Sequence, residues 1–359
     1  MVVRPFFHAW ERRIHAGSVR VVRPFDWGLD WLAHAGLPPI EADAGVDGGS
    51  GAPADDRAIA AALVAAGERA TAASEAFYAV DPAPAYELDA ANVLRFESAV
   101  TTPHPENNIV QARYFRAENG SRKAGVVLLP QWNCDAGGHI GLAKLLARFN
   151  MSGLRLSLPY HDVRMPPELT RADYIVSANV GRTLAVCRQA VLDARRAVMW
   201  MAAQGYERVG ILGTSLGSCL SMLTAAHEPL VRAAALNHVS PYFADVVWDG
   251  LSTEHVREGL EGRVALEALR RMWLPISPQP YLDRMKDKRT LLVYARYDLT
   301  FPVQLSRQLI ADFGSRRLPH QSFVLPCGHY STGVSPFKWV DGYVLTKFLH
   351  DSLVKGYTT

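Results

Sequence analysis

The sequence predicts an α/β fold in which a mostly parallel sheet of eight strands carries helices on both faces. From about residue 91, short β-rich runs alternate with longer helical patterns, which is typical of such a sheet. The chain has 359 residues, 49% of them hydrophobic and 20% charged, so it can bury a large core. Crossovers of this kind place functional loops beyond the carboxyl ends of the strands.

Residues 1–90 lie outside this alternation and are interpreted as an N-terminal extension. Its first 35 residues carry aromatic side chains and arginines in no clean period. Residues 36–56 are small, proline, glycine and acidic residues, which cannot bury enough apolar area to offset chain entropy, so we expect a flexible linker. Residues 57–80 are rich in alanine and are expected to be helical. The extension can cap a site, join a dimer or dock on the core, and the sequence does not choose between these.

The α/β core is assigned to residues 91–240 and 289–355. Strands are expected at 94–100, 110–117, 124–130, 154–159, 208–213, 232–239, 290–296 and 321–326. Helices are expected near 139–149, 175–203, 216–226, 303–313 and 336–353. The first two strands could form an antiparallel pair at one edge. Residues 241–288 interrupt the alternation with helix-like patches and a proline-rich passage, so we expect them to form a lid over the carboxyl edge of the sheet.

The most informative motif falls between a strand and a helix in the middle of this pattern. It reads Gly213-Thr214-Ser215-Leu216-Gly217 and fits G-x-S-x-G. In that motif the serine occupies a sharp turn that exposes its hydroxyl, and the following helix points free N–H groups at developing negative charge. The alternative is a glycine-rich turn with a helix-capping serine. A dinucleotide-binding turn is disfavoured because G-x-G-x-x-G is absent.

Two further residues follow this serine in the order that such a site requires, with the acid first and the histidine second. Asp298 comes just after an apolar strand, and His329 follows the last predicted strand. A neutral imidazole can remove the proton of Ser215, and a carboxylate can orient that imidazole. Asp245, which follows an earlier strand, is a competing candidate for the acid.

The chain from about 91 to 355 resembles the α/β-hydrolase superfamily through LLPQWN, GTSLG, ARYDLTFP and CGHYSTG in that order. The resemblance implies an oxyanion hole made by the backbone N–H of Leu216 and an N–H in the loop after the third strand, which we place at Trp132. Pro130-Gln131 replaces the usual His-Gly opening of that loop, so Gln131 is an alternative donor. Gln131 is also a possible pocket residue, as are His161, His238 and Tyr242, which follow strands as well. These polar residues either line a substrate pocket or bond to neighbouring loops.

These features predict a serine hydrolase that cleaves a carboxylic ester of a small-molecule acyl substrate, with no metal or organic cofactor. Amide or peptide hydrolysis, acyl transfer and a non-catalytic binding protein of the same fold remain alternatives. The net charge of +3, without a block of basic residues, argues against nucleic acid as a partner. No apolar run approaches the roughly 20 residues of a membrane span, so a cytoplasmic protein is expected. An oligomer formed through the extension is left open.

Overall fold

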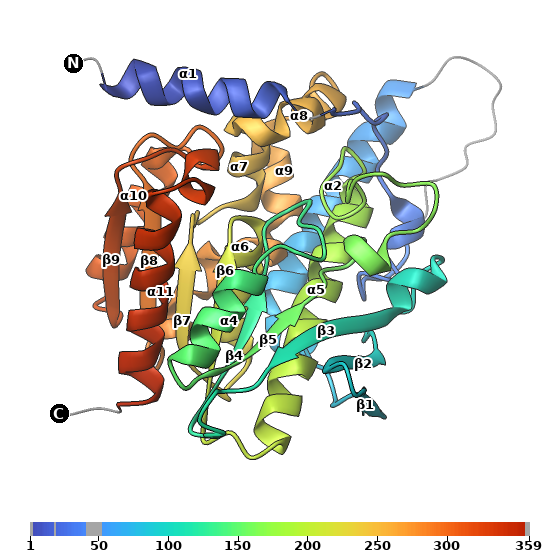
Figure 1. Cartoon of the computed structure of the whole chain (residues 1–359). Coiled ribbons are helices and arrows are strands. Elements are labelled where there is room, and N and C mark those ends of the chain that lie inside the picture. Colours follow the sequence, from blue (N-terminus) through green and yellow to red (C-terminus); the bar gives the residue numbers. More distant parts are fainter. Residues whose placement is uncertain (1–2, 18, 41–51, 356–359) are drawn as a thin grey trace.

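One mixed sheet runs through the computed structural model, which describes residues 3–17, 19–40 and 52–355 (Figure 1). Within that part of the chain the strands are β1 Tyr86–Leu88, β2 Val93–Glu97, β3 Ile109–Phe115, β4 Ala124–Leu129, β5 Ser152–Leu156, β6 Arg208–Thr214, β7 Val231–Asn237, β8 Arg289–Ala295 and β9 His320–Leu325. Their order across the sheet is β1-β2-β3-β5-β4-β6-β7-β8-β9. Neighbouring strands are parallel from β5 through to β9 and antiparallel from β1 to β5.

The prediction of eight strands is wrong by one, because the described residues contain nine. Each of the eight predicted strands is present, and the first two pair antiparallel, as expected. The additional strand is β1, which has three residues and pairs with β2 at the edge of the sheet. Three residues are too short for a period of two to stand out from the surrounding loop. The sheet therefore begins inside the segment assigned to the extension.

The sheet is covered on both faces, and alternate residues of each strand explain how. In β4, Val126 and Leu128 point to the face that holds α4 (Ile140–Arg148) and α11 (Phe337–Leu353). Val127 and Leu129 point to the opposite face. That face holds α5 Val180–Ala203, α6 Leu216–His227 and α10 Val303–Ser315. All four β4 side chains are fully buried, as expected for a central parallel strand.

The N-terminal extension contains α1 Val3–Ala16, α2 Ala52–Ala72 and α3 Ser74–Phe77. Residues 41–51, the middle of the predicted linker, lie outside the described residues, and α2 begins at Ala52. α2 packs along α9, and Trp27 donates a hydrogen bond from its indole to Asp56 in α2 (2.8 Å). The extension is thus packed against the body of the molecule at both of its helical ends.

Residues 241–288 form a helical insertion between β7 and β8. It contains α7 Phe243–Asp249, α8 Glu254–Leu260 and α9 Leu266–Met272, with the 3₁₀ turns η4 Leu251–Thr253, η5 Leu274–Ile276 and η6 Gln279–Met285. Figure 1 shows α1, α7 and α8 together at the end of the sheet toward which the central parallel strands point. The loops that follow β6, β8 and β9 open toward the same end, and the last of them contains the turn η7 Tyr330–Gly333.

Candidate active site

Ser215 occupies a sharp turn between the end of β6 and the start of α6. Its backbone has φ 56° and ψ −122°, a conformation that is strained for a residue with a side chain. The N–H of Ser215 donates to the carbonyl oxygen of Asn237 on β7 (2.8 Å), which fixes the turn against the neighbouring strand. The surrounding structure therefore holds the serine in the geometry expected of the G-x-S-x-G turn.

Both glycines of this motif are required by close backbone approaches. A Cβ at Gly213 would lie 2.0 Å from the carbonyl oxygen of Gly217, so only glycine lets strand and helix meet. A Cβ at Gly217 would lie 2.1 Å from the carbonyl oxygen of Leu129 at the end of β4. The second glycine thus brings the start of α6 against the loop that contains Gln131 and Trp132.

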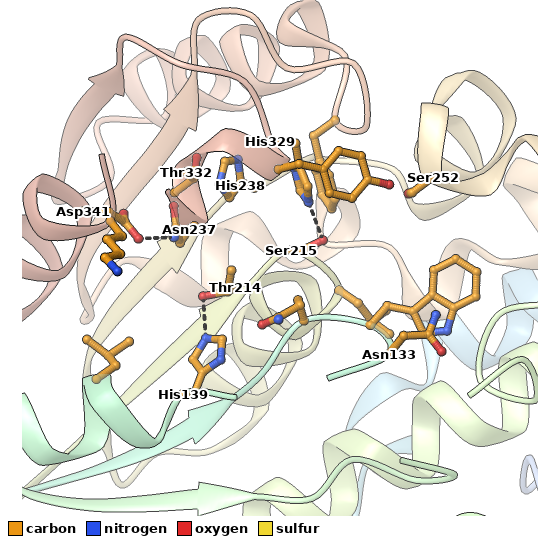
Figure 2. A pocket seen from close by; sticks show the side chains of 18 of the residues that line it. Asn133, His139, Thr214, Ser215, Asn237, His238, Ser252, His329, Thr332 and Asp341 are labelled. Carbon is orange, nitrogen blue, oxygen red and sulfur yellow. Dashed lines mark hydrogen bonds between the residues drawn. The ribbon is translucent and has the colours of Figure 1, made fainter. Parts of the chain in front are cut away.

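His329, in the loop after β9, lies between Ser215 and Asp298. Its Nε2 is 3.1 Å from Oγ of Ser215 (Figure 2). Its Nδ1 is 3.0 Å from Oδ2 of Asp298. Phe301 stacks on the imidazole with ring centroids 5.5 Å apart and planes 3° from parallel. The three side chains that the sequence order selected are therefore brought into one hydrogen-bonded chain.

Asp298 is fixed from two sides in the loop after β8. Its Oδ1 accepts hydrogen bonds from the backbone N–H of Thr300 (2.8 Å) and of Phe301 (2.7 Å). Its Oδ2 faces the imidazoles of His329 and His238. Although burial alone favours the protonated acid, the two imidazoles hold the pKa of Asp298 well below its usual range. The carboxylate in turn outweighs the effect of burial on His329 and raises the pKa of that imidazole.

His238 was predicted as a pocket residue, and it does line the cavity in front of Ser215. The structure adds a contact that the sequence did not reveal, because its Nδ1 lies 2.9 Å from Oδ2 of Asp298. The residue is buried and has a positive φ of 57°. Burial first, and the nearby His329 second, lower the pKa of His238, so it remains neutral and donates to the carboxylate.

Asp245, the competing candidate for the acid, lies elsewhere. Its carboxylate binds both ends of the Arg270 guanidinium, at 2.7 and 3.0 Å. This pairing joins α7 to α9 within the helical insertion. Of the two acids, Asp298 is the one that meets His329.

The loop after β4 brings Gln131 and Trp132 to the cavity, next to the start of α6. Among the described residues, the backbone N–H groups of Leu216 and Trp132 make no hydrogen bond, so both are available to a ligand. The next N–H, that of Asn133, donates to Nε2 of His161 (3.0 Å). His161 is buried and does not line the cavity, contrary to the pocket interpretation; it supports the loop from behind.

Tyr242, also predicted as a possible pocket residue, does not line this cavity. It precedes α7. Its phenol lies in the field of Asp312 and Asp245, and burial together with these carboxylates raises its pKa. A position after a strand end did not suffice to predict where this side chain points.

Ser215 opens into a cavity of about 870 Å³. Apolar lining comes from the insertion and the core, namely Val176, Leu216, Phe243, Val246, Val247 and Phe301. Residues of α4 and α11 also line the cavity, namely Leu142, Lys144, Leu145, Arg148, Lys338 and Trp339. A cavity of this size accommodates an organic ligand.

Two polar pairs beside the serine were missed in the sequence (Figure 2). His139 Nε2 lies 2.9 Å from the hydroxyl of Thr214, and Asn237 donates to Asp341 (2.9 Å). Burial raises the pKa of Asp341 to about 7. Each pair joins the end of a strand to a helix on the face of the sheet that holds α4 and α11. Residues so far apart in sequence form no short motif from which the pairing could be predicted.

His238, Asp298 and His329 form the one place among the described residues where a metal ion has candidate ligands. Ligand atoms of His238, Asp298 and His329 lie within 4.8 Å of one another. Both imidazole Nδ1 atoms are, however, hydrogen-bonded to the same oxygen of Asp298. An ion bound through these two Nδ1 atoms would have to displace both hydrogen bonds.

No described helix is both long enough and apolar enough to cross a membrane. No protein-family model and no curated protein matches the sequence.

Solved structures nonetheless resemble the fold. Acetyl xylan esterase 1 from Thermoanaerobacterium sp. superposes with a TM-score of 0.58 at 15% identity, over 83% of this chain and 94% of the esterase. An acylaminoacyl peptidase from Pyrococcus horikoshii gives 0.54 at 12% identity over 78% of this chain, which spans only 51% of the peptidase. A lipase in its open form gives 0.54 at 10% identity, over 72% of this chain and 98% of the lipase. The chain therefore shares the α/β-hydrolase fold with these proteins.

Proposed function

We propose that this chain is a serine hydrolase that cleaves carboxylic esters through an acyl-enzyme on Ser215. One observation carries the proposal, the continuous chain of contacts from Oγ of Ser215 through His329 to Asp298 at 3.1 and 3.0 Å. A serine hydroxyl is a weak nucleophile until an adjacent base removes its proton, and these contacts supply that base and its orienting acid.

In the first half of the reaction, Oγ of Ser215 bonds to the acyl carbon while its proton passes to Nε2 of His329. The bond to the alcohol oxygen then breaks, and His329 returns the proton to the leaving alcohol. In the second half, a water molecule gives a proton to His329 and its oxygen attacks the acyl carbon. Ser215 then regains the proton as the carboxylic acid leaves, so one ester and one water give one acid and one alcohol. Asp298 stays ionised and stabilises the imidazolium.

The oxyanion of the tetrahedral intermediate is assigned to the backbone N–H of Leu216 and that of Trp132, with Gln131 as the alternative second donor. Leu216 is the first residue of α6, where the N–H groups lack intrahelical partners and the helix dipole favours negative charge. The close approach at Gly217 supports this pairing, since it packs the start of α6 against the carbonyl groups of Leu129 and Pro130. Removing one donor of this type typically costs 10²–10³ in kcat.

The helical insertion 241–288 is proposed as the lid that sets substrate size. Its residues Phe243, Val246, Val247, Ser252 and Thr253 line the cavity above Ser215. Their mostly apolar character favours a small-molecule ester with an apolar acyl group. No metal or organic cofactor enters the proposed reaction.

The proposal is tested with Ser215→Ala and p-nitrophenyl acyl esters of graded chain length. Loss of the nucleophile is expected to lower kcat by about 10⁶. A fluorophosphonate should label the wild-type chain at Ser215 and leave the variant unlabelled. Ser121→Ala, in the loop before β4, is the matched control and should keep full activity. Unchanged ester hydrolysis by Ser215→Ala would refute the proposal, and turnover of acyl amides alone would move it to amide hydrolysis.

A further inference from the structure

Glu11, in the middle of α1, is buried against the loop that carries His329, with 0% of its surface exposed. Its Oε2 accepts a hydrogen bond from the backbone N–H of Tyr330 (2.7 Å). Its Oε1 accepts from both the N–H and the hydroxyl of Ser331, at 2.9 and 2.8 Å. These contacts fix the backbone immediately after His329.

The residue before His329 is shaped around the same carboxylate. A Cβ at Gly328 would lie 2.3 Å from the carboxyl carbon of Glu11, so any larger residue would collide with it. The N–H of Gly328 donates to the hydroxyl of Ser331 (2.8 Å), which closes the loop around Glu11. The carboxylate therefore packs against the residue before the histidine and binds the two residues after it.

Other contacts of α1 place it against both loops that meet at the site. The ring of Phe7 stacks on Tyr297, the residue before Asp298, with centroids 4.8 Å apart and planes 9° from parallel. Phe7 also meets Phe337 at the start of α11 (5.9 Å). At the other end of the helix, Nδ1 of His15 lies 3.3 Å from the hydroxyl of Tyr330. The helix thus spans the loop of the acid and the loop of the base.

We propose that Glu11 is a positioning residue for His329, and that α1 completes the active site by holding this imidazole over Ser215. The inference rests on the proposed function. It assigns a role to a part of the chain that lies outside the α/β-hydrolase core. The carboxylate does not touch the reacting atoms, and it acts through the backbone of Tyr330 and Ser331.

The proposal has an electrostatic consequence that a purely mechanical contact lacks. After burial, which lowers it, and Asp298, which raises it, the negative charge of Glu11 further raises the pKa of His329. The other titratable or charged groups described around this loop are Asp298, His238, Cys327, Tyr330, Arg20 and His15, with Glu254 beside His15 and Asp341 near Cys327. Removing the charge of Glu11 should move the acid limb of the pH profile to lower pH.

The test compares Glu11→Gln with Glu68→Gln, a matched control in which the acid of α2 loses its ion pair with Arg271 on α9. The amide of Glu11→Gln keeps the shape of the side chain but presents an NH₂ group where an acceptor is needed. We expect kcat on p-nitrophenyl esters to fall about 10- to 100-fold, since misplacement by about 1 Å can cost 10². KM should stay within about threefold, as the cavity lining is untouched. The control should keep wild-type kcat and pH profile.

Three measurements make the result decisive. The fluorophosphonate labelling rate of Ser215 should fall in parallel with kcat, and Glu11→Asp, which retains the charge, should keep the acid limb of the wild type. Melting temperatures set an assay temperature at which every variant is folded. A folded Glu11→Gln with kcat within about twofold of wild type and an unmoved acid limb overturns the inference. Failure of the wild-type chain to label at Ser215 overturns the proposed function instead.

Discussion

The turn at Ser215 and the loop at His329 are held in place by different means. The serine is fixed through backbone contacts, because the two glycines beside it allow close approaches and its own N–H donates to the carbonyl oxygen of Asn237. The histidine loop has local hydrogen bonds too, such as that from the N–H of Gly328 to the hydroxyl of Ser331. It depends in addition on side chains from far along the chain, with Glu11 behind it and Asp298 beside it.

This difference explains why the serine leaves a short motif in the sequence, whereas Asp298 and His329 were predicted only from their order along the chain. A turn that must be built from local backbone leaves a short motif, as it does in Gly213-Thr214-Ser215-Leu216-Gly217. A loop held by distant carboxylates leaves only a histidine after a strand. Substitutions should therefore act on the turn mainly through backbone clashes and on the loop mainly through lost hydrogen bonds.

Asp298→Asn should give the largest effect on the loop. The amide presents a donor where the carboxylate accepts from two imidazoles, so His329 is no longer held in the tautomer that can accept a proton from the serine. By analogy with other triads we expect kcat to fall by about 10⁴ with the fold intact. Steady-state ester hydrolysis measures it. Asp245→Asn, which affects the pair with Arg270, is the control, and an equal loss in that variant would contradict the assignment of the acid.

Gly217→Ala should break the serine turn through the backbone alone. The added methyl would lie 2.1 Å from the carbonyl oxygen of Leu129, so α6 must move away from the loop of Trp132. We expect the free energy of unfolding to fall by about 1–3 kcal/mol and kcat by about 10² or more. Urea unfolding and ester hydrolysis test both values.

Gly314→Ala in α10 is the control for that substitution, because no atom lies within 4 Å of the added methyl. Alanine at a helical position should leave stability unchanged or raise it by up to about 1 kcal/mol. A Gly217→Ala variant as stable and active as this control would show that the turn tolerates a side chain.

His238→Asn should have a smaller effect on activity, because it changes a side chain that supports the loop. The positive φ at this position suits asparagine, but its shorter side chain cannot reach Asp298 as the imidazole does. A hydrogen bond to a charged group contributes about 1.5–3 kcal/mol, so stability should fall within that range. We expect kcat to fall about tenfold, since Asp298 retains its two backbone donors and His329. Unchanged stability in urea would show that the second imidazole is dispensable.

The smallest expected change in activity comes from pH alone, in the wild-type chain. His329 must be neutral to accept the proton of Ser215, and its pKa is raised above the ordinary value of 6.5. Activity is therefore lost as the pH falls through a value above 6.5, and kcat/KM measured between about pH 5 and 9 locates it. Burial also raises the pKa of Asp341 to about 7, so Asp341→Asn is the control and should leave this limb in place.

Much of the fold followed from the sequence because it depends on local pattern. The runs at 124–130 and 290–296 are long and apolar, and they form the interior strands β4 and β8. β1 was missed because three half-exposed residues at an edge carry no readable period. The order of residues along the chain also favoured Asp298 as the acid. Only the structure shows that the competing acid, Asp245, is bound to Arg270.

The remaining site residues could not be predicted because their positions depend on contacts across the fold. His161 and Tyr242 follow strands just as His238 does, yet only His238 faces the cavity. The direction of a loop side chain is set by its neighbours in space, such as the N–H of Asn133 that binds His161. Glu11 lay in a segment whose aromatics and arginines had no period at all.

The contact between Glu11 and Ser331 joins residues 320 positions apart, nearly the whole length of the chain. During synthesis, α1 leaves the ribosome long before the loop that contains Ser331 has been made. The hydrogen bonds of Glu11 can therefore form only after the last strand has been synthesised. A bulky fusion placed ahead of residue 3 would be attached to α1, the helix that must dock on the His329 loop late in folding. A fusion after residue 355 would not be attached to α1. Purification tags for this protein therefore belong at the carboxyl end.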